Sequence, residues 1–192
     1  MPRIRIFAGP NGSGKSTLFK IVSERVNVHT FINADEIEKE LSASGFLRLD
    51  NFSITLVNEN WQNYQENKNS LSSKLFQSTV VYISNNILVA KTQKWDPYLA
   101  ASIAEFLRLQ CLQQKNSFSF ETVMSHSSKV ELLKKAKNMG YRVYLYFTCT
   151  ETPKINVQRV DIRVSKGGHA VPEEKIITRY YRTLNLLSDI VA

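Results

Sequence analysis

The sequence predicts an α/β fold with a mainly parallel sheet flanked by helices. Predicted strands and helices alternate along most of the chain, an order that favours parallel strands joined by helical crossovers. A glycine-rich stretch, "FAGPNGSGKST" (7–17), also follows a short apolar strand and opens a helix. With 192 residues, of which 43% are hydrophobic and 22% charged, the chain has the composition of one globular domain over 1–192.

The strands are predicted from short apolar runs. "RIRIFAG" (3–9) alternates charged residues with Ile and Phe before it becomes apolar, which is typical of a buried strand. The predicted strands cover 3–9, the start of 30–41, 117–122 and 141–149. In parallel sheets ligands bind beyond the carboxyl ends of the strands, and the glycine loop, Asp35 and Glu121 all fall at such ends.

The helices are predicted from apolar spacing and from signals at their ends. Asp96 followed by Pro97 indicates a helix start, and Ser128 with Glu131 has the spacing of a capping box. The predicted helices cover 14–26, the rest of 30–41, 96–115, 127–140, 152–168 and 171–187. Left-handed glycines are expected to end three of them, at Gly45, Gly140 and 167–168.

Residues 46–95 are rich in Asn, Gln and Ser, and we expect a helical insertion there. One amphipathic helix is predicted from spacings of 3, 4 and 3 at Ile54, Val57, Trp61 and Tyr64. A second is predicted, against the β-branched "TVVYI", from steps of four at Leu75, Thr79, Ile83 and Ile87.

Charge and cysteine content narrow the class of protein. The 25 Lys and Arg against 17 Asp and Glu give a net charge of +8, which suggests an anionic partner, either nucleotide or nucleic acid. Cys111 and Cys149 lie outside any CxxC or Cys/His cluster, so neither a disulfide framework nor a zinc site is indicated. Without a signal peptide or a membrane-spanning apolar run, we expect a cytoplasmic protein with no membrane partner.

The stretch from Gly9 to Ser16 fits the phosphate-binding pattern G-x-x-x-x-G-K-[ST] at every position. Glycines let successive backbone N–H groups point inward, and the helix N-terminus adds partial positive charge. Lys15 can bridge the terminal phosphates, and Ser16 can bind Mg²⁺. We therefore expect a P-loop NTPase-type fold that binds ATP and Mg²⁺. The predicted nucleotide-binding residues are Gly9, Pro10, Asn11, Gly12, Ser13, Gly14, Lys15, Ser16 and Thr17.

Two carboxylates are candidates for catalysis, and each has a structural alternative. Asp35 in "FINADEI" could be a general base for an acceptor hydroxyl, or a first-turn acid in a helix that Asn33 caps with Glu36 at N3. Glu121 could hold Mg²⁺ or orient the acceptor together with Thr122, or it could be a solvated acid at a strand end. The strand at 141–147 has no acid at its end until Glu151, so the usual apolar-run-plus-Asp metal motif is absent.

A basic helix face is the remaining candidate. Arg159 and Arg163 are four residues apart, and Lys166 continues the face. Like charges at this spacing repel, and a bound phosphate would relieve the repulsion. The alternative is a solvated basic face, which is still more favoured for Arg179 and Arg182.

These elements, in this order, resemble the zeta-toxin family of P-loop kinases. The resemblance rests on "INADEI" (32–37), "FSFET" (118–122) and "RVDIRVSKGGHAVP" (159–172), and it covers 3–45 and 117–187. It implies an ATP-dependent kinase that phosphorylates a hydroxyl of a small molecule, a UDP-sugar such as UDP-N-acetylglucosamine. It also implies a protein inhibitor, an antitoxin, as partner.

The resemblance assigns roles to single positions. Lys15 matches the phosphate-contacting lysine, and Asp35 matches the base. Glu121 and Thr122 match the acceptor-side element. Apart from the resemblance, we also expect Asn33 to bind the acceptor and Glu121 to bind the metal together with Ser16. The arginine role falls on Arg159 or Arg163. Residues 46–95 are longer than expected for this branch, and one more strand would be expected after "SDIVA" (188–192).

Two other functions fit parts of the sequence. A nucleic-acid end kinase would suit the net charge, but only "RYYR" (179–182) interleaves aromatic with basic residues, so we do not expect a nucleic-acid partner. A non-catalytic, nucleotide-dependent interaction protein could use 46–95 as its docking surface.

Overall fold

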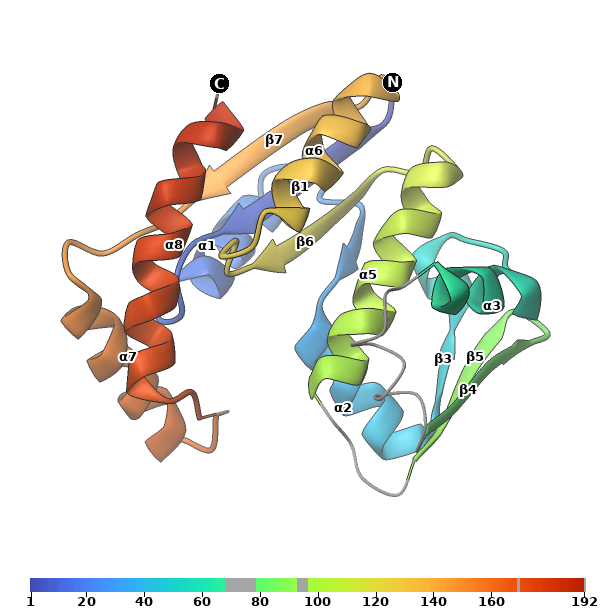
Figure 1. Ribbon diagram of the computed structural model, residues 1–192, viewed down its shortest axis with the longest axis horizontal. Helices are drawn as coiled ribbons and strands as arrows, with labels where there is room; N and C mark the ends of the chain where they lie inside the picture. The colour runs from blue at the N-terminus through green and yellow to red at the C-terminus, as the bar shows by residue number, and fades with distance from the viewer. Residues whose placement is uncertain (68–78, 93–96, 169, 192) are drawn as a thin grey trace. The chain divides into compact units, whose positions relative to one another are not determined.

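The computed structural model describes residues 1–67, 79–92, 97–168 and 170–191, and its contacts divide the chain into two compact units. Unit 1 contains Met1–His29 and Ser119–Ala192, and unit 2 contains Thr30–Phe118. Figure 1 traces the helices and strands of both. Leu75 and Asp96, on which two of the helix predictions rest, lie outside the described part of the chain.

The sheet of unit 1 positions the glycine loop. Its strands lie in the order β6 (Phe118–Thr122), β1 (Arg3–Ala8) and β7 (Arg142–Phe147), and β6 belongs to this unit from Ser119 on. β1 runs parallel to β7, with Arg3 opposite Arg142 and Ala8 opposite Phe147. Every residue of β1 after Arg3 is buried, as expected for a central strand. The α/β fold class predicted from the sequence is confirmed.

The described residues of unit 1 form four helices: α1 (Lys15–Ser23), α6 (Ser128–Asn138), α7 (Pro153–Ser165) and α8 (Glu173–Val191). In Figure 1, α6 crosses in front of the sheet and α1 lies behind it. The ring of Phe7 in β1 meets Phe19 of α1 edge to face and stacks on Tyr146 of β7. α7 packs against α8, which also contacts α6. All four helices lie where the sequence predicts them.

The capping box predicted for α6 is wrong. The N-cap is Ser127, whose side chain makes no capping hydrogen bond, and Ser128 is the first helical residue. The amide of Ser128 instead donates to Nδ1 of His126 at 3.2 Å. The sequence pattern was displaced by one residue, so the hydroxyl of Ser128 could not reach the N3 amide. Gly140 does follow the helix in the left-handed region, at φ 84°.

Unit 2 combines helices with a small antiparallel sheet. Two of its elements are β2 (Thr30–Ile32) and α2 (Ala34–Ser44), which ends at Gly45 with φ 78°, as predicted. Among the described residues, the sheet of this unit has the strand order β3-β5-β4. The bounds are β3 (Phe46–Arg48), η1 (Leu49–Phe52), α3 (Asn58–Glu66), β4 (Thr79–Ser84), β5 (Ile87–Thr92) and α5 (Pro97–Gln113).

The core of unit 2 is an aromatic cluster between α3 and α5. Trp61 meets Phe106 edge to face, and Tyr64 lies 5.2 Å from Phe106 between ring centroids. The Tyr64 hydroxyl donates to the Ser102 carbonyl at 2.9 Å. The helix predicted around Trp61 and Tyr64 is confirmed, although it begins at Asn58 and leaves Val57 exposed.

Replacing Phe106 with Ala is expected to lower the free energy of unfolding by about 3 to 5 kcal/mol, because the fully buried ring touches both other aromatics and would leave a cavity. Urea denaturation followed by tryptophan fluorescence measures this change. Tyr98→Ala, at an exposed position of the same helix, is the control and should change stability by less than about 0.5 kcal/mol. An equally stable Phe106→Ala protein would contradict the aromatic core.

The second helix predicted within 46–95 is wrong. Residues 79–92 form a hairpin of β4 and β5, in which Ser84 pairs with Ile87. Its two-residue turn, Asn85 and Asn86, has φ of 49° and 59°, as type I′ hairpin turns require. The alternation of "TVVYIS" and "ILVAKT" therefore outweighs the four-residue steps. The described residues of the segment form one α-helix and three strands, and the compact unit around it is larger than the expected insertion.

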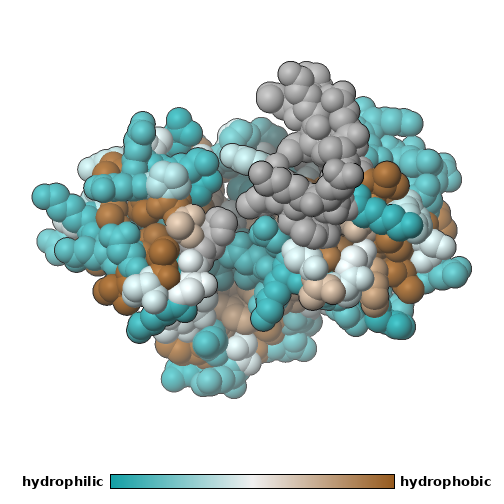
Figure 2. Space-filling view, turned by 90° about the horizontal axis from the view of Figure 1, so that it is seen from below, coloured by the Kyte–Doolittle hydropathy of each residue, from teal (hydrophilic) through white to brown (hydrophobic). Residues whose placement is uncertain are grey.

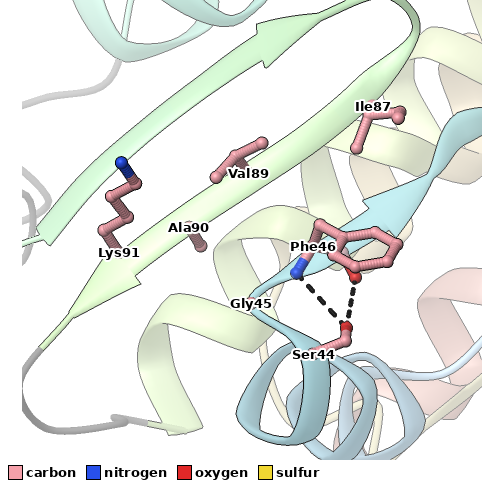
Figure 3. A pocket seen from close by; sticks show the side chains of 7 residues that line it. All are labelled: Ser44, Gly45, Phe46, Ile87, Val89, Ala90 and Lys91. Carbon is pink, nitrogen blue, oxygen red and sulfur yellow. Dashed lines mark hydrogen bonds between the residues drawn. The ribbon is translucent and has the colours of Figure 1, made fainter.

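The surface and cavities add few functional clues. Figure 2 shows apolar groups on one face as patches among hydrophilic ones. A cavity of about 490 Å³ in unit 2 is bordered by Ser44, Gly45, Phe46, Ile87, Val89, Ala90 and Lys91, none of which is a predicted site residue (Figure 3). Within the described ranges, every helix is too short or too polar to cross a membrane.

Candidate phosphate-binding site

The glycine loop is held between the carboxyl ends of β6 and β7. The amide of Gly9 donates to the Thr122 carbonyl at 3.3 Å, and the amide of Thr148 donates to the Ala8 carbonyl at 2.9 Å. Gly9 has φ 149°, and a Cβ there would lie 2.0 Å from the Thr148 carbonyl oxygen. Only glycine therefore fits at the start of the loop.

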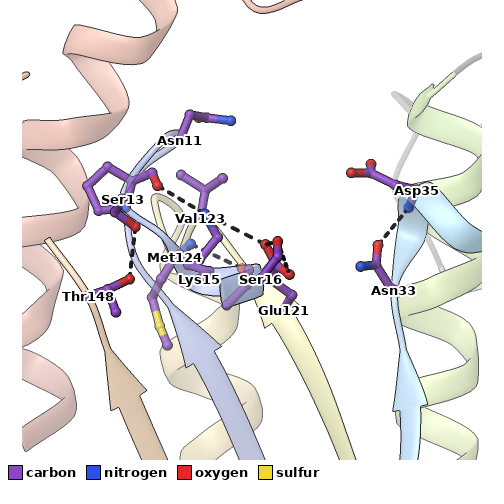
Figure 4. A network of polar contacts seen from close by, with 12 residues as sticks. Asn11, Ser13, Lys15, Ser16, Asn33, Asp35, Glu121, Val123, Met124 and Thr148 are labelled. Carbon is purple, nitrogen blue, oxygen red and sulfur yellow. Dashed lines mark hydrogen bonds and ion pairs between the residues drawn. The ribbon is translucent and has the colours of Figure 1, made fainter. Parts of the chain in front are cut away.

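Lys15, Ser16 and Glu121 form a polar cluster at the start of α1 (Figure 4). The Lys15 side chain is buried, and its Nζ donates to the Pro10 carbonyl at 2.9 Å and lies 3.9 Å from Glu121 Oε1. The Ser16 hydroxyl donates to Glu121 at 3.0 Å to Oε2 and 3.2 Å to Oε1. A hydroxyl and a carboxylate are hard oxygen ligands, so this pair fits Mg²⁺.

The rest of the loop is fixed by neighbouring polar groups. The Ser13 and Thr148 hydroxyls are 2.9 Å apart, and the Asn11 carbonyl accepts from Nδ2 of Asn156. Gly14, at φ 98°, is the N-cap of α1, so the first amides of this helix border the loop. The partial positive charge of that helix end favours an anion. Thr17 lies exposed in the first turn of α1.

Of the two candidate arginines, Arg159 contacts the loop. Its Nη1 donates to the Gly12 carbonyl at 3.4 Å. Arg163 lies near the end of α7, where its carbonyl accepts from the Gly168 amide at 2.9 Å. A Cβ at position 168 would lie 2.6 Å from Arg163 Cγ, so Arg163 packs against the glycine turn that ends α7.

The predicted acceptor-side residues have local roles in the two units. In unit 1 the Thr122 hydroxyl accepts from the Met124 amide at 3.0 Å. In unit 2 Asn33 is the N-cap of α2, and its side chain accepts from the Asp35 amide at 2.9 Å. Asp35 is exposed in the first turn of α2. Its role as a base stays a prediction.

The polar residues that follow β7 are not among the site residues that the sequence predicts. Thr148 touches Ser13, and Asn156 holds the Asn11 carbonyl. The signal was the run of hydroxyl and amide residues in "TCTETPKIN" (148–156), because such side chains after a strand can bind a neighbouring backbone.

The sheet, the helices and the glycine loop between β1 and α1 have the arrangement of a P-loop fold. Residues 98–190 match the family model described as Zeta toxin, which confirms the resemblance to that family. The matched range contains Glu121, Thr122 and Arg159, whereas the glycine loop and Asp35 precede it.

Solved structures share the fold at low sequence identity. A candidate kinase from Chloroflexus aurantiacus has a TM-score of 0.52 and 12% identity, with coverage of 93% of this chain and 76% of that one. The toxin-antitoxin system PezAT of Streptococcus pneumoniae has a TM-score of 0.52 and 14% identity. The match covers 98% of this chain and 64% of that one. The Pnkp1/Rnl/Hen1 RNA repair complex has a TM-score of 0.54 and 12% identity. The match covers 97% of this chain and 45% of that one.

One sequence relative is an uncharacterized protein of Haemophilus influenzae. It is 32% identical over 69 residues, which make up 36% of this chain. The match spans about half of the relative, 49% of its length.

Proposed function

We propose that the chain is an ATP-dependent kinase that transfers the γ-phosphoryl group to a hydroxyl of a small molecule. The observation that carries the proposal is the contact of the Glu121 carboxylate with both Ser16 and Lys15 at the glycine loop. An acid beside the loop hydroxyl and lysine is the arrangement that a metal-bound triphosphate requires.

The donor side is assigned to unit 1. Backbone amides of the loop and of the first turn of α1, within residues 11–17, would hold the phosphates, and Lys15 would contact the terminal ones. Ser16 and Glu121 would hold Mg²⁺, which neutralises charge that develops on the phosphate oxygens. Lys15 now donates to the Pro10 carbonyl, so its ammonium already lies at the loop.

The acceptor side is assigned to Asp35, Asn33, Glu121 and Thr122. In the proposed step an oxygen of the acceptor hydroxyl bonds to the γ-phosphorus while the bond to the bridging oxygen of ADP breaks. The hydroxyl proton passes to the Asp35 carboxylate. The exposed position of Asp35 in the first turn of α2 supports access to an acceptor.

The arginine role is assigned to Arg159, with Arg163 as the weaker candidate. The guanidinium of Arg159 already contacts the loop at the Gly12 carbonyl, and its five donors suit phosphate oxygens. Positive charge at this place would stabilise the moving phosphoryl group.

The acceptor we propose is a UDP-sugar such as UDP-N-acetylglucosamine, and we propose an antitoxin protein as partner. The Zeta toxin family match over 98–190 and the likeness to PezAT, a toxin-antitoxin system, support these assignments.

Incubation with labelled ATP, Mg²⁺ and a panel of acceptors tests the function. The panel contains UDP-sugars, other small hydroxyl compounds and short RNAs, and a labelled UDP-sugar is the expected product. Labelled RNA would instead favour an end kinase. Binding of ATP without any labelled acceptor would favour a nucleotide-dependent interaction protein.

Glu121→Gln is expected to raise the Mg²⁺ concentration for half-maximal phosphoryl transfer by about tenfold, because the neutral amide loses the charge that attracts the metal ion. A Mg²⁺ titration at saturating ATP measures this shift. Glu131→Gln, which neutralises an exposed acid in α6, is the control. An unchanged Mg²⁺ dependence would exclude Glu121 from the metal site.

A further inference from the structure

A buried asparagine joins the phosphate loop to the helix that carries Arg159. The Asn156 side chain in α7 is fully buried. Its Nδ2 donates to the Asn11 carbonyl of the loop, and its Oδ1 accepts from the Thr150 hydroxyl. Both polar ends of one amide are therefore occupied, and a buried amide without these partners would be costly.

The backbones of the loop and of α7 also touch at this point. A Cβ on Gly12 would lie 2.6 Å from the Asn156 carbonyl oxygen and 3.2 Å from its Cα. Gly12 has φ 75°, so both its left-handed backbone conformation and the lack of space for a Cβ favour glycine at this position. Little room is left for α7 to shift against the loop without breaking the contacts of Asn156.

α8 holds the other end of this connection. The Tyr180 hydroxyl donates to the Thr150 carbonyl at 2.7 Å and lies 3.1 Å from the Glu151 carbonyl. Desolvation above all raises the pKa of Tyr180, so its hydroxyl stays protonated as a donor. A continuous polar path therefore leads from α8 through Thr150 and Asn156 to the loop.

We propose that Asn156 is a positioning residue that holds Arg159 at the phosphate loop. Arg159 follows Asn156 by three residues on α7, so both side chains lie on nearly the same face of the helix. One reaches the Asn11 carbonyl and the other the Gly12 carbonyl. This role rests on the proposed function, in which Arg159 faces the transferred phosphoryl group. Asn156 touches the loop backbone at the Asn11 carbonyl, and we propose that it affects the terminal phosphate through Arg159.

A double-mutant cycle in nucleotide binding tests the proposal. AMP-PNP, a non-hydrolysable triphosphate, and ADP are titrated with Mg²⁺ by calorimetry into the wild type, Asn156→Ala, Arg159→Ala and the double variant. Arg159→Ala should weaken AMP-PNP binding about tenfold and ADP binding less than about twofold. Asn156→Ala should give the same selective loss, and the double variant should bind within about twofold of the weaker single variant.

Two further variants complete the design. Gln158→Ala removes an amide from an exposed position of α7 and should bind both nucleotides like the wild type. Thr150→Val removes the hydroxyl partner of Asn156 at nearly constant volume and should shift AMP-PNP binding in the same direction, by less. If Asn156→Ala fails to fold by circular dichroism, Thr150→Val alone and combined with Arg159→Ala decides the question.

Several outcomes would overturn the proposal. An equal loss of affinity for both nucleotides in Asn156→Ala would mean that Asn156 is a purely structural residue. If the fold-losses of the two single variants multiply in the double variant, Asn156 and Arg159 act independently. No selective loss in Arg159→Ala would leave nothing for Asn156 to position. The measured quantity is nucleotide affinity, which does not depend on whether any acceptor is phosphorylated. A failure to phosphorylate any acceptor would instead overturn the proposed function.

Discussion

Replacing Lys15 with Ala is expected to abolish phosphoryl transfer and to weaken ATP binding about 100-fold. The Lys15 ammonium is buried at the loop, 2.9 Å from the Pro10 carbonyl. Lys15 is the cation of α1 to which we assign contact with the terminal phosphates. A lost hydrogen bond to a charged group costs about 1.5 to 3 kcal/mol, and 2.8 kcal/mol corresponds to about 100-fold.

Calorimetric titration with ATP and Mg²⁺ measures the loss of affinity, and label transfer measures activity. Lys20→Ala, an exposed lysine of the same helix, removes the same charge from the protein and is the matched control. ATP affinity retained in Lys15→Ala would remove the basis for a nucleotide site at this loop.

Asp35→Asn is expected to slow phosphoryl transfer by about 10² to 10⁴, the contribution usual for a general base, while ATP binding stays within about twofold of the wild type. The amide keeps the size of the carboxylate, and the cap is retained because the Asn33 side chain accepts from the backbone amide of residue 35. The loss therefore reports the charge and basicity of Asp35.

Single-turnover label transfer and ATP calorimetry on the same preparation separate these effects. Glu40→Gln, an exposed acid on the same helix, is the control. Wild-type transfer by Asp35→Asn would assign Asp35 to the helix dipole alone. If Asp35→Asn loses stability together with activity, this result would also favour the structural alternative, in which Asp35 only stabilises α2.

Local sequence signals predicted most of the fold because they act over a few residues. Gly45 ends α2 in the left-handed region, and Pro153 opens α7 after Thr152, as the patterns indicate. The sequence predicts a helix where β4 and β5 form a hairpin, because the apolar residues there recur at steps of both two and four. Pairing across the Asn85–Asn86 turn decides between them, and that pairing is non-local.

The sequence predicts the candidate-site residues that belong to a motif. It does not predict the residues whose role depends on contacts made only in the folded chain. Lys15, Ser16 and Glu121 were expected from the sequence, and their side chains meet in unit 1. The choice between Arg159 and Arg163 needed the contact with Gly12, because both share one face by spacing alone. The sequence does not predict Asn156 as a site residue, because only the folded chain brings its partners, Asn11 and Thr150, next to it.

The two cysteines differ in a way that makes the phosphate loop accessible to spectroscopy. Cys149 is exposed and stands between Thr148, which touches Ser13, and Thr150, which holds Asn156. Cys111 is buried, and burial raises its pKa to about 12, so its thiol stays protonated and unreactive at neutral pH. A maleimide dye would thus label the native chain at one position, and its fluorescence would follow nucleotide arrival in real time without any engineered residue.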